Sequence, residues 1–115
     1  MSTESWRVIL YTDRTGALTV TRELAEAPPK DGARILRFLR LLEASGLLLR
    51  GQYVRHIRGK LFELRPEPWR VLYFAADGQT FVALHCFRKK TQRTPLSEIA
   101  LAEARMIEYL ERTNQ

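Results

Sequence analysis

Arginines and lysines at the expected ends of strands are the residues of this sequence best suited to chemistry. Lys60 and Arg65 bracket the run KLFELR, and Arg70 comes near the start of the next apolar run. Lys89 and Lys90 follow the last such run, after Arg88. A guanidinium binds two phosphate oxygens side by side, and a lysine crowded by other cations has its pKa lowered toward the range useful in acid–base catalysis. If the strands pair in register, these five side chains are expected to form a catalytic pocket for a scissile phosphate.

RNA is a substrate that such a pocket can cleave without further groups. Its own 2′-hydroxyl attacks the adjacent phosphate, so the protein has only to align the reacting atoms, stabilise the added negative charge and move protons. The patterns GxxxxGK[ST], GxGxxG and HExxH, which mark phosphate loops, dinucleotide sites and zinc proteases, are absent. With one cysteine and two histidines far apart in the sequence, we expect no metal site and no cofactor.

The positive charge of the chain is concentrated in its central third. Residues 50–93 carry ten basic and three acidic side chains, against seven and six in residues 1–49 and two and four in residues 94–115. A cluster of this sign suits a phosphate backbone, although a solvated surface explains the charge alone equally well. The further RNA contacts expected from this segment are Arg55, His56, Arg58, His85, Arg88 and Arg93.

Several of these residues have a purely structural interpretation. Arg65 and Arg70 are close enough in sequence to Glu63 and Glu67 to form only salt bridges. The basic run 88–90 is also typical of charges that protect an edge strand from aggregation. Both interpretations stay open from the residues alone.

The two histidines and the arginines of an expected helix are similarly ambiguous. His85 lies in an otherwise apolar run, where a hydrogen-bonded structural histidine is the commoner case. His56 is expected in a basic loop, where it would touch RNA or nothing. Arg34, Arg37 and Arg40 lie opposite the apolar side of their helix, so we assign them to solvation rather than binding.

The first half of the chain is expected to form one strand and one or two helices. Trp6–Tyr11 is rich in β-branched and aromatic residues, which predicts a strand. Val20–Ala27 is a possible short helix that Pro28 and Pro29 would stop. Apolar residues recur at helical spacing over Asp31–Ser45, which predicts an amphipathic helix with Gly46 as its C-cap.

The second half is expected to form three strands and a final helix. The strands are Lys60–Arg65, Trp69–Phe74 and Thr80–Phe87, and the short connections between them predict an antiparallel meander. Thr94 as N-cap and Pro95 at the first helical position then predict a C-terminal helix. The sequence therefore predicts a single α+β domain over residues 1–115.

Alternation within the strands predicts which side chains share a face. Leu61, Glu63 and Arg65 should point away from Phe62 and Leu64, so that Arg65 lies on a polar face. On the same argument Arg65 and His85 could share that face, provided that the strands pair in the right register.

The composition favours the cytoplasm and a chain without a membrane span. Apolar residues make up 45% and charged residues 28% of the 115 residues, and no apolar run is long enough to cross a bilayer. The N-terminus lacks the basic region and cleavage site of a secretory signal. The lone Cys86 suits a reducing compartment.

Three runs of the sequence, in this order, resemble the phage Gp49-like/HigB branch of the RelE/ParE toxin superfamily. They cover residues 53–65, which end in ELR, residues 69–74 with RVLYF, and residues 84–99 with KKTQxTPxxEI. The looser helical pattern before them matches too, so the resemblance covers nearly the whole chain. Family members often have glycine and a small apolar residue where this chain has Cys86 and Arg88.

The resemblance implies a RelE-like fold and an endoribonuclease toxin that cuts mRNA on the ribosome. It also implies a cognate antitoxin, in this branch often a helix-turn-helix protein of the HigA type. Carried over by motif, Arg65 of ELR is the phosphate-stabilising arginine, and Lys89 and Lys90 of KKTQ are cationic site residues, with Lys60 and Arg70 as further members.

Two other functions fit the same resemblance. ParE-like members inhibit DNA gyrase and cut no RNA, and an inactive RNA-binding module would keep the basic surface. The ELR and KKTQ motifs favour the nuclease, because a gyrase inhibitor needs no phosphate pocket.

Overall fold

The computed structural model describes residues 5–114. Residues 1–4, on which the expected lack of a secretory signal partly rests, lie outside this range, as does residue 115. The elements are β1 (Arg7–Leu10), α1 (Thr19–Ala25), α2 (Pro29–Ser45), two single 3₁₀ turns (Gly46–Leu48 and Gly51–Tyr53), β2 (Val54–Arg58), β3 (Leu61–Leu64), β4 (Trp69–Ala76), β5 (Thr80–Arg88) and α3 (Leu96–Thr113).

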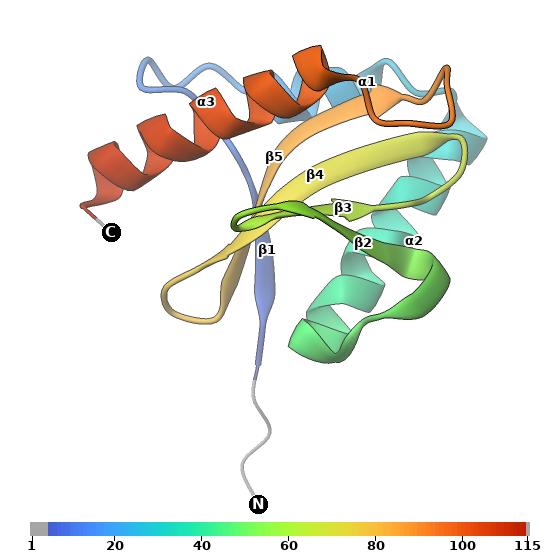
Figure 1. The fold of residues 1–115 in the computed structure, drawn as a ribbon, viewed down its shortest axis with the longest axis horizontal. Coiled ribbons are helices and arrows are strands. Elements are labelled where there is room, and N and C mark those ends of the chain that lie inside the picture. Colours follow the sequence, from blue (N-terminus) through green and yellow to red (C-terminus); the bar gives the residue numbers. More distant parts are fainter. Residues whose placement is uncertain (1–4, 115) are drawn as a thin grey trace, which may run out of the picture.

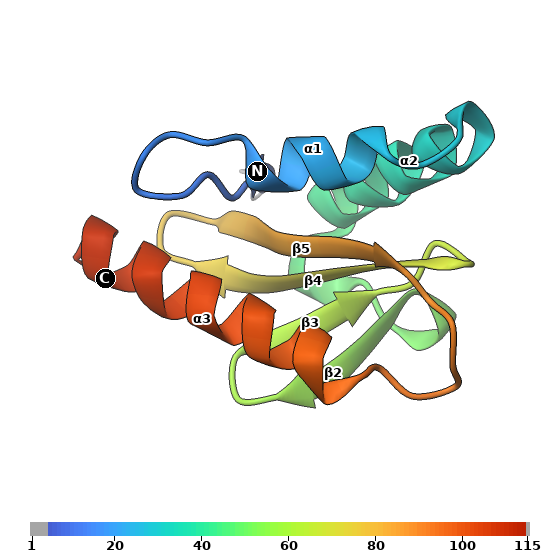
Figure 2. The ribbon, with the colours of Figure 1, turned by 90° about the horizontal axis from the view of Figure 1, so that it is seen from above.

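The strands form one five-stranded sheet in the order β1-β5-β4-β3-β2. β1 runs parallel to β5, and all the other pairs are antiparallel. Helix α2 packs on one face of the sheet and α3 crosses the other, while α1 runs alongside β5, as Figures 1 and 2 show. The expected α+β class and the meander of β3, β4 and β5 are confirmed.

The core lies on both sides of β4 and β5. These two strands are buried along most of their length, which explains why their sequences are nearly continuous apolar runs rather than alternating ones. On one face the sheet packs against Ile35, Leu39 and Leu42 of α2. On the other it packs against α3, where the rings of Phe74 and Tyr109 meet edge to face with centroids 5.9 Å apart.

Proline and glycine set the ends of α2; Gly46 was expected as its C-cap, whereas the helix begins at Pro29, two residues before the predicted Asp31. Pro29 occupies the first turn, where its missing N–H removes no helical hydrogen bond. Gly46 takes a φ of +59° at the C-cap. A Cβ atom there would lie 2.8 Å from Cδ1 of Trp6, so both the backbone conformation and the space require glycine.

Two local expectations were wrong. The segment around His56 is the edge strand β2 and not a loop, with Arg55 opposite Glu63 and His56 opposite Phe62. α3 begins one residue later than predicted, because Pro95 is its N-cap residue and makes no side-chain cap. The hydroxyl of Thr94, which was expected to cap the helix, donates instead to the carboxylate of Glu63.

Candidate functional site

A buried carboxylate lies at the centre of the cationic cluster. Glu63 is 1% exposed and pairs across the strands with Leu72, which in turn pairs with His85. Its Oε1 atom lies 3.5 Å from Nε of Arg70 and 3.8 Å from Nε of Arg65. One acidic side chain on the α3 face of the sheet therefore holds two of the predicted site arginines together.

A second carboxylate extends the cluster to the surface. Arg70 Nη2 donates to Oε1 of Glu67 over 2.8 Å, and Nζ of Lys89 lies 3.8 Å from the same oxygen. The hydrogen bond from Arg70 lowers the pKa of the Glu67 carboxyl, which is exposed and ionised. The backbone N–H of Lys89 donates to the carbonyl of Pro68 over 2.8 Å, which fixes the end of β5 against this segment.

Arg70 was expected to touch substrate, but it is only 2% exposed. Its guanidinium is used by Glu63, Glu67 and the carbonyl of Trp69, which accepts a hydrogen bond of 2.9 Å. A cation enclosed in this way orients the two carboxylates and has no free face for an RNA phosphate. Its place in the site is therefore that of a positioning residue.

Arg65 is the arginine of the cluster that remains available to a ligand. Its backbone N–H donates to the carbonyl of Tyr53 over 3.0 Å, and its side chain is 30% exposed. The Nε atom is buried and finds no hydrogen-bond partner within residues 5–114. A buried unsatisfied donor is costly, so an anion that accepted its hydrogen bond would stabilise this arrangement. Arg65 was expected on an open polar face, but its side chain is half-buried. The side chain of Glu63, on the same face of β3, is buried as well.

Arg65 also lines a cavity of about 680 Å³ at the end of the sheet. The other lining residues are Arg34, Arg37, Phe38, Gln52, Tyr53 and Glu67. The cavity therefore adjoins the carboxylate and cation cluster directly, through Arg65 and Glu67.

The β2–β3 hairpin separates two predicted residues from this cluster. Lys60 is exposed in the turn before β3, at the opposite end of that strand from Arg65. Arg58 is held by Glu103 of α3 through two hydrogen bonds of 2.8 and 2.6 Å. The expectation that Lys60 lies in one pocket with Arg65 was therefore wrong. Arg58 was expected to bind RNA, but it forms an ion pair with Glu103.

Other predicted RNA-binding residues stay exposed. Arg55 projects from β2, and the His56 ring lies against Phe62, with Nε2 2.8 Å from the carbonyl of Gly59. The basic residues at the end of β5 and in the segment before α3 are also exposed; they are Arg88, Lys90 and Arg93.

His85 is not an RNA-facing residue, because it is 6% exposed and both of its ring nitrogens are used. Nδ1 lies 2.9 Å from Glu23 of α1 and Nε2 lies 2.7 Å from Glu98 of α3. Arg105 also donates to Glu23 over 2.9 Å. The neighbouring Cys86 thiol is buried, which raises its pKa to about 12, so the thiol is not a reactive nucleophile.

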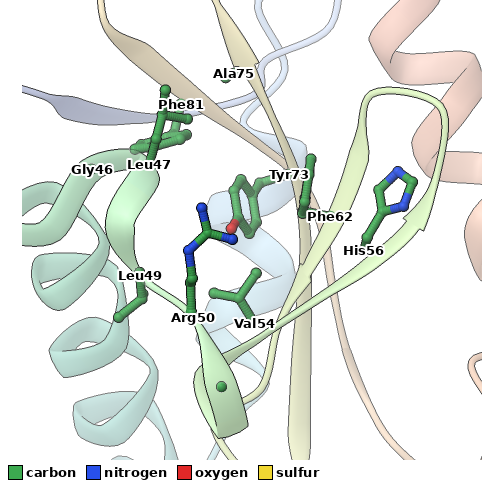
Figure 3. Close-up of a pocket in the computed structure, with 11 residues that line it drawn as sticks. Gly46, Leu47, Leu49, Arg50, Val54, His56, Phe62, Tyr73, Ala75 and Phe81 are labelled. Atoms are coloured by element: carbon green, nitrogen blue, oxygen red, sulfur yellow. The ribbon is translucent and has the colours of Figure 1, made fainter.

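A second cavity, of about 560 Å³, lies on the face of the sheet opposite the side chain of Glu63 (Figure 3). Its rings come from Phe62, Tyr73 and Phe81, with Arg50 and His56 beside them. Burial raises the pKa of the Tyr73 hydroxyl, which excludes it as a base near neutral pH. This cavity suits an apolar group, whereas the cluster around Arg65 suits a phosphate.

The sequence did not single out five residues that belong to the site. Glu63 and Glu67 were considered only as salt-bridge partners, and Thr94 only as a helix cap. Arg34 and Arg37 were assigned to solvation, because helical spacing shows that they face away from the core and not what lies on their side. The alternation of β3 placed Glu63 beside Arg65, and that was the one usable signal.

Residues 5–114 contain neither a metal-binding cluster nor a membrane-spanning helix. Within that range, no group of three or more His, Cys, Asp and Glu side chains is arranged to hold a metal ion. No helix in the same range has the length and apolar character needed to cross a membrane.

Two solved structures share this fold. One is the toxin-antitoxin complex RelBE2 from Mycobacterium tuberculosis, with 23% identity, 75% of this chain and 100% of that chain covered, and a TM-score of 0.58. The other is the archaeal RelE-RelB complex from Pyrococcus horikoshii OT3, with 20% identity, 78% and 100% covered, and a TM-score of 0.61. At these identities the likeness concerns the fold, and it confirms the expected RelE-like architecture.

No curated protein matches the sequence. The family model described as phage derived protein Gp49-like matches residues 22–107, a range that contains every residue of the cluster around Glu63. Because this range is most of the chain, the protein belongs to the family of phage-derived Gp49-like proteins.

Proposed function

We propose that this protein is the toxin of a type II toxin-antitoxin system and that it cleaves mRNA on the ribosome. The observation that carries the proposal is Arg65, whose buried Nε has no hydrogen-bond partner among residues 5–114 and only a long ion pair of 3.8 Å with Glu63. Its side chain lines the cavity next to Lys89, Arg70 and Glu67. Family membership and the RelE-like fold support the same assignment.

The proposed reaction is internal transesterification of RNA. The 2′-oxygen forms a bond to phosphorus as the bond from phosphorus to the 5′-oxygen breaks, which gives a 2′,3′-cyclic phosphate and a 5′-hydroxyl. The guanidinium of Arg65 stabilises the added negative charge on the phosphoryl oxygens. No step in this scheme calls for a metal ion or a cofactor.

Two side chains of the cluster are placed to move the protons. Glu67 is exposed and ionised, so it is our candidate to accept the proton of the 2′-hydroxyl. Lys89 lies 3.8 Å from Glu67 and is our candidate to protonate the leaving 5′-oxygen. The buried Arg70 holds Glu67 in place and does not touch the RNA in this scheme.

A cognate antitoxin would silence such a site by covering its cations. The two structures of similar fold are complexes with an antitoxin, RelB in the archaeal one. For this chain we propose an antitoxin of the helix-turn-helix, HigA-like type with an acidic segment that binds over Lys89 and Lys90. Ribosomes and mRNA as partners place the action of the toxin in the cytoplasm.

Primer-extension mapping of transcripts after induced expression tests the proposal. We expect cuts in the translated part of an mRNA, which disappear when its start codon is removed and when Arg65→Ala replaces the parental protein. Cuts that persist on untranslated RNA would contradict ribosome dependence. A toxic protein that cuts no RNA and inhibits DNA gyrase would overturn the nuclease assignment. A harmless protein that only binds RNA would overturn both the nuclease and the toxin assignments.

A further inference from the structure

We propose that the cavity beside Arg65 is a nucleotide subsite, which holds the RNA nucleotide next to the scissile phosphate. The cavity lies between α2, the 3₁₀ turn before β2 and the segment after β3. This inference rests on the proposed function, because it extends the same site to a part of the substrate that the cluster around Glu63 does not reach.

The first argument is the charge of the cavity wall. Arg34, Arg37 and Arg65 line it, against the single carboxylate of Glu67. Arg34 is already used, because Nη1 donates to the carbonyl of Glu67 over 2.8 Å and lies 3.6 Å from Asp31. Arg37 is exposed, and no residue within 5–114 pairs with it. Arg37 is therefore unpaired within this range, and Arg65, held by a long ion pair of 3.8 Å with Glu63, can still bind phosphate oxygens through its exposed part.

The second argument is the aromatic part of the wall. The rings of Phe38 and Tyr53 lie with centroids 5.8 Å apart and planes inclined by 60°. Both residues are partly exposed, and the exposed Gln52 also lines the cavity. An aromatic face stacks on any nucleobase, and an amide side chain offers one donor group and one acceptor to a base edge.

The third argument is that the cavity and the catalytic cluster are held in fixed relation. The backbone of Arg65 is hydrogen-bonded to Tyr53, and Arg34 of α2 is hydrogen-bonded to the backbone of Glu67. A strand of RNA whose phosphate lies at Arg65 therefore has its neighbouring nucleotide at the cavity. An acidic peptide would satisfy the arginines, but it would leave the rings and the amide without a matching group, so the wall favours RNA.

A binding measurement with an uncleavable probe tests the subsite. The probe is a fluorescein-labelled pentaribonucleotide whose 2′-hydroxyls are methylated, so that transesterification cannot occur, and affinity is measured by fluorescence anisotropy at low salt. Arg37→Ala is compared with Arg40→Ala, which removes the same charge from the exposed face of the same helix outside the cavity. We expect Arg37→Ala to weaken binding about five- to tenfold more than Arg40→Ala.

The aromatic contact is tested with a second matched pair. Tyr53→Phe keeps the ring, so it should bind within about twofold of the parental protein, whereas Tyr53→Leu should weaken binding about ten- to a hundredfold. Thermal unfolding of each variant verifies that the fold is retained. If Tyr53→Leu unfolds, protection of the Gln52 side-chain amide signals by the probe replaces it as the readout.

Three results would overturn the subsite. They are equal losses for Arg37→Ala and Arg40→Ala, equal affinities for Tyr53→Phe and Tyr53→Leu, and displacement of the probe by an equimolar poly-glutamate peptide. Cleavage assays keep this failure distinct from that of the proposed function. If Arg65→Ala abolishes mRNA cleavage while the matched pairs do not differ, the nuclease stands and the subsite falls; if Arg65→Ala cleaves normally, the proposed function falls.

Discussion

The Nε2 atom of His85 on β5 lies 2.7 Å from Oε1 of Glu98 in the first turn of α3. The other ring nitrogen faces Glu23 of α1, and Arg105 of α3 donates to that same carboxylate. A buried imidazole on the sheet thus joins the helices on its two sides. Because the ring lies between two carboxylates, its protonation should affect how firmly α1 and α3 are held.

The stability of the protein should therefore depend on pH through His85. Burial alone lowers the pKa of His85, but the hydrogen bonds with Glu23 and Glu98 outweigh it and raise the pKa. A raised pKa contributes stability that is complete below the unfolded value of about 6.5 and is lost as pH rises through the folded value. Burial alone raises the pKa of Glu23, but the hydrogen bonds from His85 and its other partners outweigh burial and lower the pKa. The stability that Glu23 contributes is therefore lost at low pH.

We expect the free energy of unfolding to be highest between about pH 5 and pH 6.5 and to fall as the pH rises above this range, through the raised pKa of His85 in the folded protein. Urea unfolding at a series of pH values measures this. His85→Gln should flatten the decline on the alkaline side, because it removes the group that titrates. An unchanged slope in that variant would mean that other groups cause the decline.

Binding to RNA should weaken steeply with salt, because cationic side chains release counterions from the phosphates. With about five phosphate contacts to single-stranded RNA, affinity should fall about a hundredfold between 50 and 200 mM salt. Arg65→Ala should reduce the slope of log affinity against log salt by about 0.7. A flat titration of the parental protein would argue against an electrostatic RNA surface.

The antitoxin should protect Lys89 and Lys90 from amine-reactive labelling, because the proposed acidic segment covers them. Lys60 is exposed on the β2–β3 turn, at the other end of the sheet from Lys89, and serves as the internal control. Labelling is quantified by mass spectrometry of the free protein and of the complex. If Lys89 and Lys90 are labelled in the complex to the same extent as in the free protein, the antitoxin inhibits elsewhere.

The elements that the sequence predicted best are those with the most buried side chains. β4, β5 and α2 have strong apolar patterns, because nearly every position of the strands and one side of the helix face the core. β2 was missed because it is an edge strand whose exposed positions carry Arg55, His56 and Arg58. The parallel pairing of β1 with β5 joins distant parts of the chain, and no local pattern specifies it.

Strand order explains which site residues could be placed in advance. In an antiparallel meander the end of β3, the start of β4 and the end of β5 lie at the same end of the sheet, which brings Arg65, Arg70 and Lys89 together. Lys60 precedes β3, so by the same rule it lies at the opposite end of the sheet. Arg37 could not be placed, because the packing of α2 across the sheet decides its neighbours and strand pairing does not.

The buried pair of Glu63 and Arg70 should be sensitive to the loss of one partner. Both side chains are at most 3% exposed, so removing one leaves an uncompensated charge. Arg70→Ala should lower the free energy of unfolding by about 3 to 5 kcal/mol, as measured by urea unfolding. The double variant Glu63→Gln with Arg70→Met should recover a large part of this loss. A double variant as unstable as Arg70→Ala would show that the arginine contributes through packing and the Trp69 carbonyl rather than through the ion pair.

Arg65 offers the sharpest test of the proposed chemistry. If its guanidinium stabilises the phosphorane, Arg65→Ala should lower the rate of mRNA cleavage about a hundred- to a thousandfold, which corresponds to about 3 to 4 kcal/mol of transition-state stabilisation. The fold and antitoxin binding should persist, because its ion pair with Glu63 is long and its Nε has no hydrogen bond to lose. Arg65→Lys should restore little activity, since an ammonium keeps the charge but not the planar pair of donors.

The matched control for this test is Arg55→Ala, which removes an equally basic side chain from the exposed edge strand β2. Cleavage is followed on a translated reporter mRNA, and thermal unfolding and antitoxin pull-down establish that each variant is folded. The control should retain most of the parental rate, because general attraction to RNA is shared among many cations. A folded Arg65→Ala variant that cleaves at the rate of Arg55→Ala would remove Arg65 from the chemistry. The buried donor would then need a structural explanation, with Glu63, 3.8 Å away, as the group that keeps the guanidinium in place.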